Sequence, residues 1–279
     1  MFENVLIGVD GSANSRDAIA LARRLADDGA KLTLAHVHPG VLNPMHATTP
    51  GMLEDERAAS HELLERERAA AEIDADLVSV VSTTPGRGLH DAAEDQRADL
   101  LVVGSTSRGP FKRAMLGDDA RASLNGAPCA VAIASRAYAT QPTSTRAVGV
   151  GYDGSPESET ALATARALAE RSGASLRALQ VVSLPNYAFG PVALVSAEGI
   201  DALIAEAAER LRQLDGVDGR AVYGLVGEEL AAFGDELDLL VVGSRGYGPA
   251  RRLVLGSASH YLQRHARCSL LVLPRGAHA

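Results

Sequence analysis

The chain has little of several residue types, and each shortage narrows what it can be. It contains no Trp, and 4% of its 279 residues are aromatic, against a hydrophobic content of 46%. Any hydrophobic core must therefore be built mainly from Ala, Val and Leu. We interpret the two cysteines, Cys129 and Cys268, as buried free thiols of a reducing compartment rather than as a disulfide or metal ligands.

An excess of basic residues and long apolar runs are also missing. The formal net charge is -8, which argues against a nucleic-acid partner because neutralising phosphates requires a basic face. No apolar run approaches the ~20 residues that cross a bilayer, and the first residues lack the basic and apolar parts of a secretory signal. We therefore expect a cytoplasmic protein with no membrane or nucleic-acid partner. The charge still allows a small anionic ligand in one local pocket.

Most of the chain repeats itself once. The segment LLVVGSTSRGPFKRAMLGDDA, from Leu100, matches LLVVGSRGYGPARRLVLGSAS, from Leu239, and VLIGVDGSANS, from Val5, matches VGVGYDGSPES, from Val148. Copies of roughly 140 residues have the size of domains rather than of solenoid repeats. We expect a first domain at residues 1–136, a linker at 137–146 and a second domain at 147–279.

Short apolar runs alternate with helical patterns in both copies. In the first copy, Ala18, Leu21, Ala22 and Leu25 have the spacing of a half-buried helix, and further helices are expected at 53–71, 88–97 and around 121–124. Strands are expected at 5–9, 32–37, 77–82, 100–103 and 130–134, and at 148–150, 176–182, 221–225, 239–242 and 270–273.

This alternation predicts an α/β fold. Continuous apolar strands imply parallel sheets that are covered on both faces, so we expect two tandem, doubly wound, five-stranded parallel sheets with helices on both faces. The last strands, 130–134 and 270–273, would otherwise leave open sheet edges. Pairing of the copies through these strands, about a pseudo-two-fold axis, would cover both edges at once.

Two loops of the second copy contain residues suited to a ligand. In such sheets, ligands bind beyond the carboxyl ends of the strands, where the strand order reverses. If the first and fourth strands are neighbours, the turn at Asp153 meets the loop Gly243-x2-Gly246-x9-Gly256-Ser257. Glycines allow close approach of the backbone to a ligand, and the free N–H groups of a helix that opens at Gly256-Ser257 favour a phosphate. The spacing matches neither a P-loop nor the dinucleotide fingerprint.

This pattern, in a domain that opens with Val-Asp-Gly-Ser, resembles the universal stress proteins over essentially the whole chain. The resemblance implies an α/β domain that binds ATP or AMP, with any Mg²⁺ held mainly by the phosphates. It also implies that such domains pair through their last strands, so we expect the two copies to pair through 130–134 and 270–273. It also implies a role for each matching residue: Asp153 at the adenosine, Val181 at the adenine, Gly243 and Gly246 along the ribose and phosphates, and Gly256 and Ser257 at the phosphate. We predict no catalytic and no metal-ligating residue.

The first copy departs from the pattern. Ser107 replaces the second glycine of the loop, and Asp118 replaces the serine. Four positions still match the pattern, so a weak second nucleotide site remains an alternative: Asp10, Val37, Gly104 and Gly117. We therefore expect the nucleotide to be held mainly by the second domain.

The predicted function is that of an ATP-binding regulatory or stress-adaptation module. A client protein would be a further partner, and a homodimer is left open. Two alternatives stay open: a slow ATP hydrolase or nucleotidyl transferase, and a nucleotide-free interaction protein. No general base or metal-ligating carboxylate pair stands near the loop, so we expect at most slow hydrolysis.

Other candidate residues have plainer interpretations. His36 and His38 alternate along a strand without a third metal ligand, and Ser12 and Ser155 have no His and Asp partners that would make them nucleophiles. The basic loop residues are interpreted as a solvated face rather than as phosphate ligands: Arg108, Lys112, Arg113, Arg251 and Arg252.

Overall fold

The computed structural model describes residues 1–39, 50–105, 126–141, 144–183, 196–244, 253 and 256–274, and for residues 50–53 the backbone alone. The first half contains β1 (Asn4–Gly8), α1 (Ala13–Leu25), β2 (Lys31–His38), α2 (Pro50–Ala71), β3 (Asp76–Val81), α3 (Pro85–Gln96), β4 (Leu100–Gly104) and β5 (Ala130–Ala134). A short 3-10 helix, η1 (Tyr138–Thr140), follows. The second half contains β6 (Ala147–Gly151), α5 (Pro156–Ser172), β7 (Ser175–Val182), α6 (Ala197–Arg212), β8 (Asp218–Tyr223), α7 (Val226–Gly234), β9 (Leu239–Gly243), α8 (Ser257–His265) and β10 (Ser269–Leu273). The helix predicted around 121–124 lies outside the described residues.

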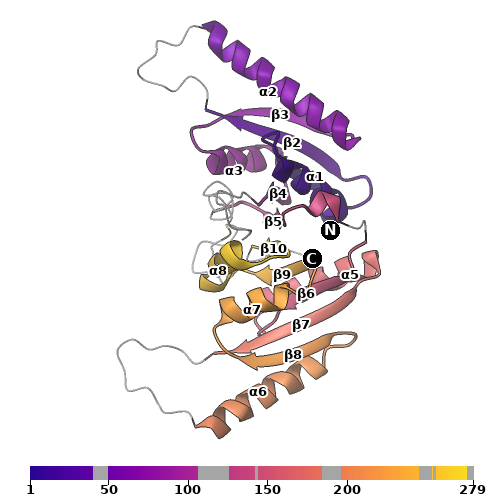
Figure 1. Cartoon of the computed structure of the whole chain (residues 1–279), viewed down its shortest axis with the longest axis vertical. Helices are drawn as coiled ribbons and strands as arrows, with labels where there is room; N and C mark the ends of the chain where they lie inside the picture. The colour runs from indigo at the N-terminus through magenta and orange to yellow at the C-terminus, as the bar shows by residue number, and fades with distance from the viewer. Residues whose placement is uncertain are drawn as a thin grey trace, which may run out of the picture.

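The described strands form one continuous sheet of 10 strands, in the order β3-β2-β1-β4-β5-β10-β9-β6-β7-β8. Neighbouring strands are parallel within each half, whereas β5 and β10 meet antiparallel, with Leu271 opposite Ala132. The two halves consequently lie end to end in an elongated molecule (Figure 1). The predicted α/β class and the predicted pairing through the last strands are both confirmed.

Each face of this sheet carries a hydrophobic core that continues through both halves. One core joins leucines of α1, α2, α5 and α6, namely Leu21, Leu64, Leu162 and Leu211. The core on the other face joins leucines of α3, α7 and α8, namely Leu89, Leu230 and Leu262. Separating the halves would expose apolar surface on both faces, which is unfavourable in water.

The burial of individual residues follows the sequence pattern where that pattern is strong. The four apolar residues predicted on one face of α1, Ala18 to Leu25, are each at most 2% exposed. The apolar strands β5 and β10 are buried at every position. The prediction for β8 is wrong in its bounds, since the strand is Asp218–Tyr223 rather than 221–225. β8 is an outer strand that begins with polar residues, and the apolar Leu225 is 62% exposed as the N-cap of α7.

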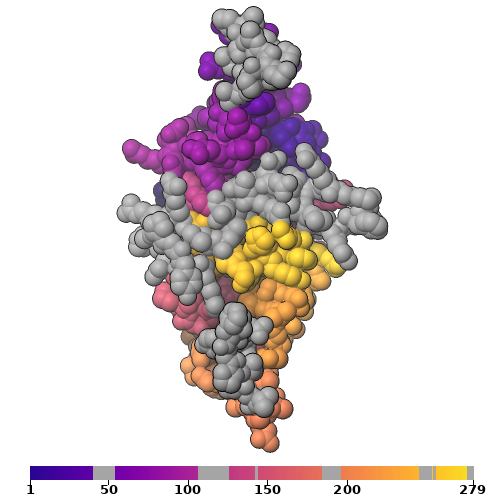
Figure 2. Space-filling model, turned by 90° about the vertical axis from the view of Figure 1, so that its left-hand side faces the viewer, coloured from indigo at the N-terminus to yellow at the C-terminus, as the bar shows by residue number. Residues whose placement is uncertain are grey.

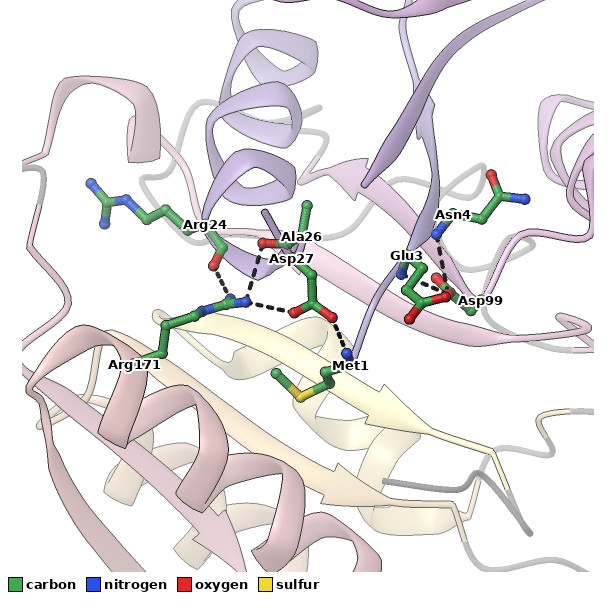
Figure 3. A network of polar contacts seen from close by, with 8 residues as sticks. All are labelled: Met1, Glu3, Asn4, Arg24, Ala26, Asp27, Asp99 and Arg171. Carbon is green, nitrogen blue, oxygen red and sulfur yellow. Dashed lines mark hydrogen bonds and ion pairs between the residues drawn. The ribbon is translucent and has the colours of Figure 1, made fainter. Parts of the chain in front are cut away.

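A polar network joins the two halves at the ends of α1 and α5 (Figure 3). Arg171 of α5 donates to the Asp27 carboxylate at 2.9 Å and to the Ala26 carbonyl at 3.1 Å, and also to the Arg24 carbonyl. Asp27 in turn pairs with the amino group of Met1. The guanidinium therefore satisfies carbonyl groups that the carboxyl end of α1 leaves without helical partners.

In each half, an aspartate side chain accepts hydrogen bonds from two backbone N–H groups at the start of the first strand. Asp99 accepts hydrogen bonds from the backbone N–H groups of Glu3 and Asn4 at 2.8 and 3.1 Å (Figure 3). In the second half, Asp238 accepts from the N–H groups of Arg146 and Ala147 at 2.6 and 3.0 Å. The repetition of this aspartate thus has a structural reason.

α8 lies close to the boundary between the halves. Figure 2 shows it in yellow near the middle of one face, between the purple first half and the orange part of the second half. None of the helices among the described residues combines the length and the apolar character needed to cross a membrane.

Candidate functional site

The sheet reverses its strand order at one point in each half. In the second half, β6 pairs with β7 on one side and with β9 on the other. In the first half, β1 pairs in the same way with β2 and β4. The first and fourth strands are therefore neighbours, as the sequence-based prediction of the site requires. Ligands of open α/β sheets bind at this reversal, beyond the carboxyl ends of the strands.

The second half has a cleft at this position. Its cavity volume is about 130 Å³, whereas a single bound water needs roughly 10–15 Å³, so the cleft has room for a small organic ligand. One wall is apolar, and it is formed by Leu179, Val181, Val226, Leu230, Val242 and Leu262. The polar residues that line the cleft are Asp153, Ser155, Glu157, Ser158, Ser183, Ser257 and Ser259.

Five of the six site residues predicted in the second half line this one cleft, although they are far apart in the sequence: Asp153, Val181, Gly243, Gly256 and Ser257. Gly246 lies outside the described residues. The structure therefore brings the predicted residues together, while their contacts with a nucleotide stay a prediction.

Asp153 has a structural role in the turn that precedes α5. Its Oδ1 accepts hydrogen bonds from the backbone N–H of Ser155 at 3.1 Å and from the Ser155 hydroxyl at 2.5 Å. Gly154 between them has a φ of +77°, which favours glycine. The first half repeats this turn, since Asp10 accepts from the N–H of Ser12 at 2.9 Å. The Asp-Gly-Ser sequence thus builds the same turn in both halves.

Gly243 is required by packing as well as by its position in the cleft. A Cβ at this residue would lie 2.7 Å from the carbonyl oxygen of Glu157 in α5. The corresponding Gly104 would place a Cβ 2.1 Å from the carbonyl oxygen of Asn14 in α1. Both distances are too short for a real contact. A glycine at the end of β4 and β9 is therefore explained without any ligand.

The amino end of α8 meets the cleft without a capping side chain. Its N-cap is Gly256, which has no side chain to accept from the first N–H groups, and its first turn contains no acidic residue. By contrast, α5 is capped by the Ser155 hydroxyl and has Glu157 and Glu159 in its first turn. The α8 end therefore leaves N–H donors and the positive end of the helix dipole for an anion in the cleft.

Tyr152 is one of the residues that line the cleft, and its side chain is buried in the core that contains Leu162. Burial, together with the neighbouring Glu159, which accepts a hydrogen bond from the hydroxyl, raises the pKa of Tyr152 to about 12. The group consequently stays protonated at neutral pH. It serves to hold the first turn of α5 rather than to exchange a proton.

The equivalent residues of the first half are described in part. Asp10, Val37 and Gly104 lie at the carboxyl ends of β1, β2 and β4, in the arrangement that Asp153, Val181 and Gly243 have in the second half. Gly117, Ser107 and Asp118 lie outside the described residues. The weak second site and its departures from the pattern therefore stay predictions from the sequence.

The other candidate residues have structural partners. The ring nitrogens of His38 contact Glu56 and Ser79 at 3.1 and 3.0 Å, and His36 contacts the Val9 carbonyl at 2.7 Å. The described residues contain no group of three or more His, Cys, Asp or Glu that could hold a metal ion. The five basic loop residues named above, from Arg108 to Arg252, lie outside the described part of the chain.

The two cysteines are buried free thiols, as predicted. Burial is the main cause that raises the pKa of Cys129 and of Cys268 to about 12. Both thiols therefore stay protonated at neutral pH, which makes them poor nucleophiles and poor metal ligands.

Sequence reasoning missed the contribution of α7 to the cleft. Val226 and Leu230 of this helix form part of the apolar wall. The signal for this helix was the apolar run from Leu230 to Phe233, which follows two acidic residues typical of a helix start. Leu262 of α8, also in the wall, lies beyond the motif that drew attention to Gly256 and Ser257.

Comparison with known proteins gives a consistent result. The model of the universal stress protein family matches residues 1–135 and again residues 144–274. A universal stress protein of Mycolicibacterium smegmatis is 30% identical over 289 aligned positions, which cover 96% of each chain. One of Mycobacterium tuberculosis is 32% identical over 182 positions, and this match spans 63% of the present chain and 61% of that relative, less than two thirds of its length.

Solved structures share the fold over almost the whole chain. A universal stress protein from Archaeoglobus fulgidus superposes with a TM-score of 0.66 at 19% identity, covering 98% of this chain and 99% of that one. A putative universal stress protein from Pseudomonas aeruginosa gives a TM-score of 0.62 at 15% identity, with 98% and 93% covered.

Proposed function

Since the chain belongs to the universal stress protein family, we propose that the cleft of its second half binds an adenine nucleotide, ATP or AMP, and that the protein acts as a nucleotide-dependent module in stress adaptation. The observation that carries the proposal is the combination of an apolar wall and an uncapped helix end in one cleft. An aromatic base and a phosphate chain need these two surfaces at opposite ends of one site.

The base has an apolar surface on which to lie. Leu179 and Val181 of β7, with Val226 and Leu230 of α7, offer aliphatic side chains on one side of the cleft. Leu179 and Leu230 are already buried, so a planar base that lies here removes apolar surface of Val181 and Val226 from water, which is favourable at roughly 25 cal/mol for each Å². Val181 in this wall is the residue that the family resemblance assigns to the adenine.

The charges of the cleft residues favour different positions for the ribose and for the phosphates. Asp153 and Glu157, at the start of α5, both line the cleft. Their carboxylates would repel phosphate oxygens and accept hydrogen bonds from ribose hydroxyls. The phosphates are then directed toward the N–H groups and hydroxyls at Gly256, Ser257 and Ser259. This polarity gives the nucleotide one orientation.

The same set of residues favours binding over hydrolysis. The described lining residues of the cleft include no Lys, Arg or His, so among them only N–H groups and hydroxyls meet the phosphates. Phosphoryl transfer needs cations that stabilise the transition state and a positioned nucleophile. Mg²⁺ bound to the phosphates would supply charge, and we expect the protein to hold ATP with at most slow turnover.

Calorimetric titration of the purified chain with ATP and AMP tests the proposal. We expect about one ATP per chain, and Gly256→Asp should remove most of the binding because it places a carboxylate at the phosphate position. Ser196→Asp is a matched control, since it puts the same charge at the N-cap of α6, away from the cleft. The proposal fails if the unmodified chain neither binds nucleotide nor releases any on denaturation, as read by mass spectrometry.

A further inference from the structure

The nucleotide loop of the second half is bonded to the backbone of the first half. The N–H of Gly126 donates to the Leu253 carbonyl at 2.8 Å, and the N–H of Leu253 donates to the Ala127 carbonyl at 2.9 Å. Leu253 stands in the sequence between Gly246 and Gly256, within the loop that carries the predicted phosphate contacts. Gly126 and Ala127 precede β5 of the first half.

The contact is buried on both sides. Leu253 and Ala127 are each 0% exposed and belong to the same hydrophobic core. The two reciprocal hydrogen bonds are therefore shielded from water, where breaking them would leave buried polar groups without partners. This makes Leu253 a fixed point of the loop, held by the other half of the molecule.

The fixed point lies close to the proposed phosphate position. Leu253 is three residues before Gly256, and a fully extended chain spans at most roughly 3.6 Å for each residue, so roughly 11 Å is the greatest separation of the two Cα atoms. Gly256 lines the cleft. A change in the position of Leu253 is thus transmitted to the N–H groups at the start of α8 over a short covalent path.

We propose that the first half acts as a positioning domain for the nucleotide loop of the second half, and that the anchor formed by Gly126, Ala127 and Leu253 sets the nucleotide affinity. The inference rests on the proposed function. Because Leu253 is already held, this residue loses no conformational freedom when phosphate binds, which raises affinity without any contact between the first half and the ligand. By reciprocity, bound nucleotide tightens the association of the halves.

Gly126→Ala tests the anchor from the half that does not hold the nucleotide. Gly126 has a φ of +88°, and a Cβ there would meet nothing closer than the His90 ring at 3.9 Å, so the substitution strains the backbone without a clash. Gly29→Ala is the matched control, because Gly29 has a φ of +79° with nothing within 4 Å and lies away from the anchor. We expect Gly126→Ala to weaken ATP binding about five- to tenfold, and Gly29→Ala to leave the affinity unchanged.

Leu253→Ala tests the anchor from the loop itself. It removes a buried side chain, as does Leu211→Ala in α6, where Leu211 is also 0% exposed. Both variants should lose comparable stability, whereas only Leu253→Ala should lose ATP affinity. Equal affinities in these two variants, or in Gly126→Ala and Gly29→Ala, would overturn the proposal.

Hydrogen exchange of the full chain without nucleotide separates this inference from the proposed function. The Leu253 amide should be protected in the unmodified chain and exchange at least about tenfold faster in Gly126→Ala, since its acceptor lies next to the strained residue. A freely exchanging Leu253 amide in the unmodified chain overturns the anchor even if ATP binds. A protected amide in a chain that binds no adenine nucleotide overturns the proposed function, and with it the coupling, while the anchor itself stands.

Discussion

Arg171 and Asp27 form an ion pair between the two halves, with Nη1 of the arginine 2.9 Å from Oδ1 of the aspartate. The arginine also donates to two carbonyls at the end of α1. Replacing it by Gln therefore removes a charge and leaves helix-end carbonyls without a donor. Because both side chains are about a third exposed, screening limits the effect, and we expect a loss of about 1–2 kcal/mol in the free energy of unfolding.

Urea unfolding of Arg171→Gln measures this loss. Arg177→Gln is the control, since Arg177 pairs with Glu236 inside the second half at 3.2 Å and is similarly exposed. The control should lose less than about 1 kcal/mol. A cycle with Asp27→Asn isolates the pair from the carbonyl contacts. An Arg171→Gln variant no less stable than the control would contradict a structural role of this pair between the halves.

The isolated halves should not behave as independent monomers. Expressed separately, residues 1–136 and 147–279 would expose β5 and β10, which are buried at every position in the full chain. Open apolar edges pair with other strands. Light scattering should show self-association or aggregation of each half and a one-to-one complex on mixing. Two stable monomers that do not associate on mixing would show that neither half needs the pairing of β5 with β10.

ATP should survive prolonged incubation with the protein. Purified chain with Mg-ATP is expected to leave the nucleotide mostly intact, because the described cleft residues supply no positioned nucleophile and no cationic side chain. Chromatography of the nucleotides gives the readout. Several turnovers per minute that disappear in Gly246→Ala would establish the enzyme alternative instead.

Nucleotide should occupy the two halves unequally. Asp118 stands where the second half has Ser257, and a carboxylate about 4 Å from a phosphate charge is repelled by about 4 kcal/mol at an effective dielectric near 20. AMP should be affected less than ATP. Asp118→Ser combined with Ser107→Gly should add a second ATP to the calorimetric stoichiometry of about one. Two equal sites in the unmodified chain would show that the departures in the first half do not matter.

The two thiols predict a loss of stability at alkaline pH. Burial raises the pKa of Cys129 and Cys268 from an ordinary 9.0 to about 12, so the folded state keeps protons that the unfolded state releases. This stabilisation is complete below pH 9 and is lost as the pH rises toward 12, with a cost of about 1 kcal/mol for each thiol by pH 10. Unfolding at pH 8 and pH 10 measures it. The variant with both cysteines replaced by Ala should show a smaller loss, and an equal loss would assign the effect to other groups.

The central strands of the sheet could be predicted because each is a run of apolar residues. Leu100 and Leu239 each open a run of four apolar residues, and such runs are stable only as buried strands or helices. The pairing of β5 with β10 was expected from the family resemblance, and the open apolar edges gave it a physical reason. β8 was misplaced because it begins with Asp218, Gly219 and Arg220, which are not apolar and which are specified by pairing with β7. No local pattern reveals this pairing.

The sequence predicted the motif residues of the cleft but not the apolar residues that form its wall. Gly256 and Asp153 belong to short patterns with a physical meaning, whereas Val226 and Leu230 are ordinary apolar residues that reach the cleft only because α7 packs beside β7. The hydrogen bonds of Leu253 with Gly126 and Ala127 could not be predicted from any local pattern. They join residues of the two halves, and their partners are backbone atoms that any sequence could provide.

The antiparallel joint between β5 and β10 has a consequence for how such a molecule changes over time. In a dimer of identical chains, a substitution at the symmetric interface occurs on both sides at once. Here Ala132 and Leu271 face each other across the joint as independent residues, and the covalent link keeps the halves at a millimolar effective concentration. Each half can therefore accumulate its own substitutions. One half can lose its ligand site and serve to position the other half, while the pairing of β5 with β10 is kept.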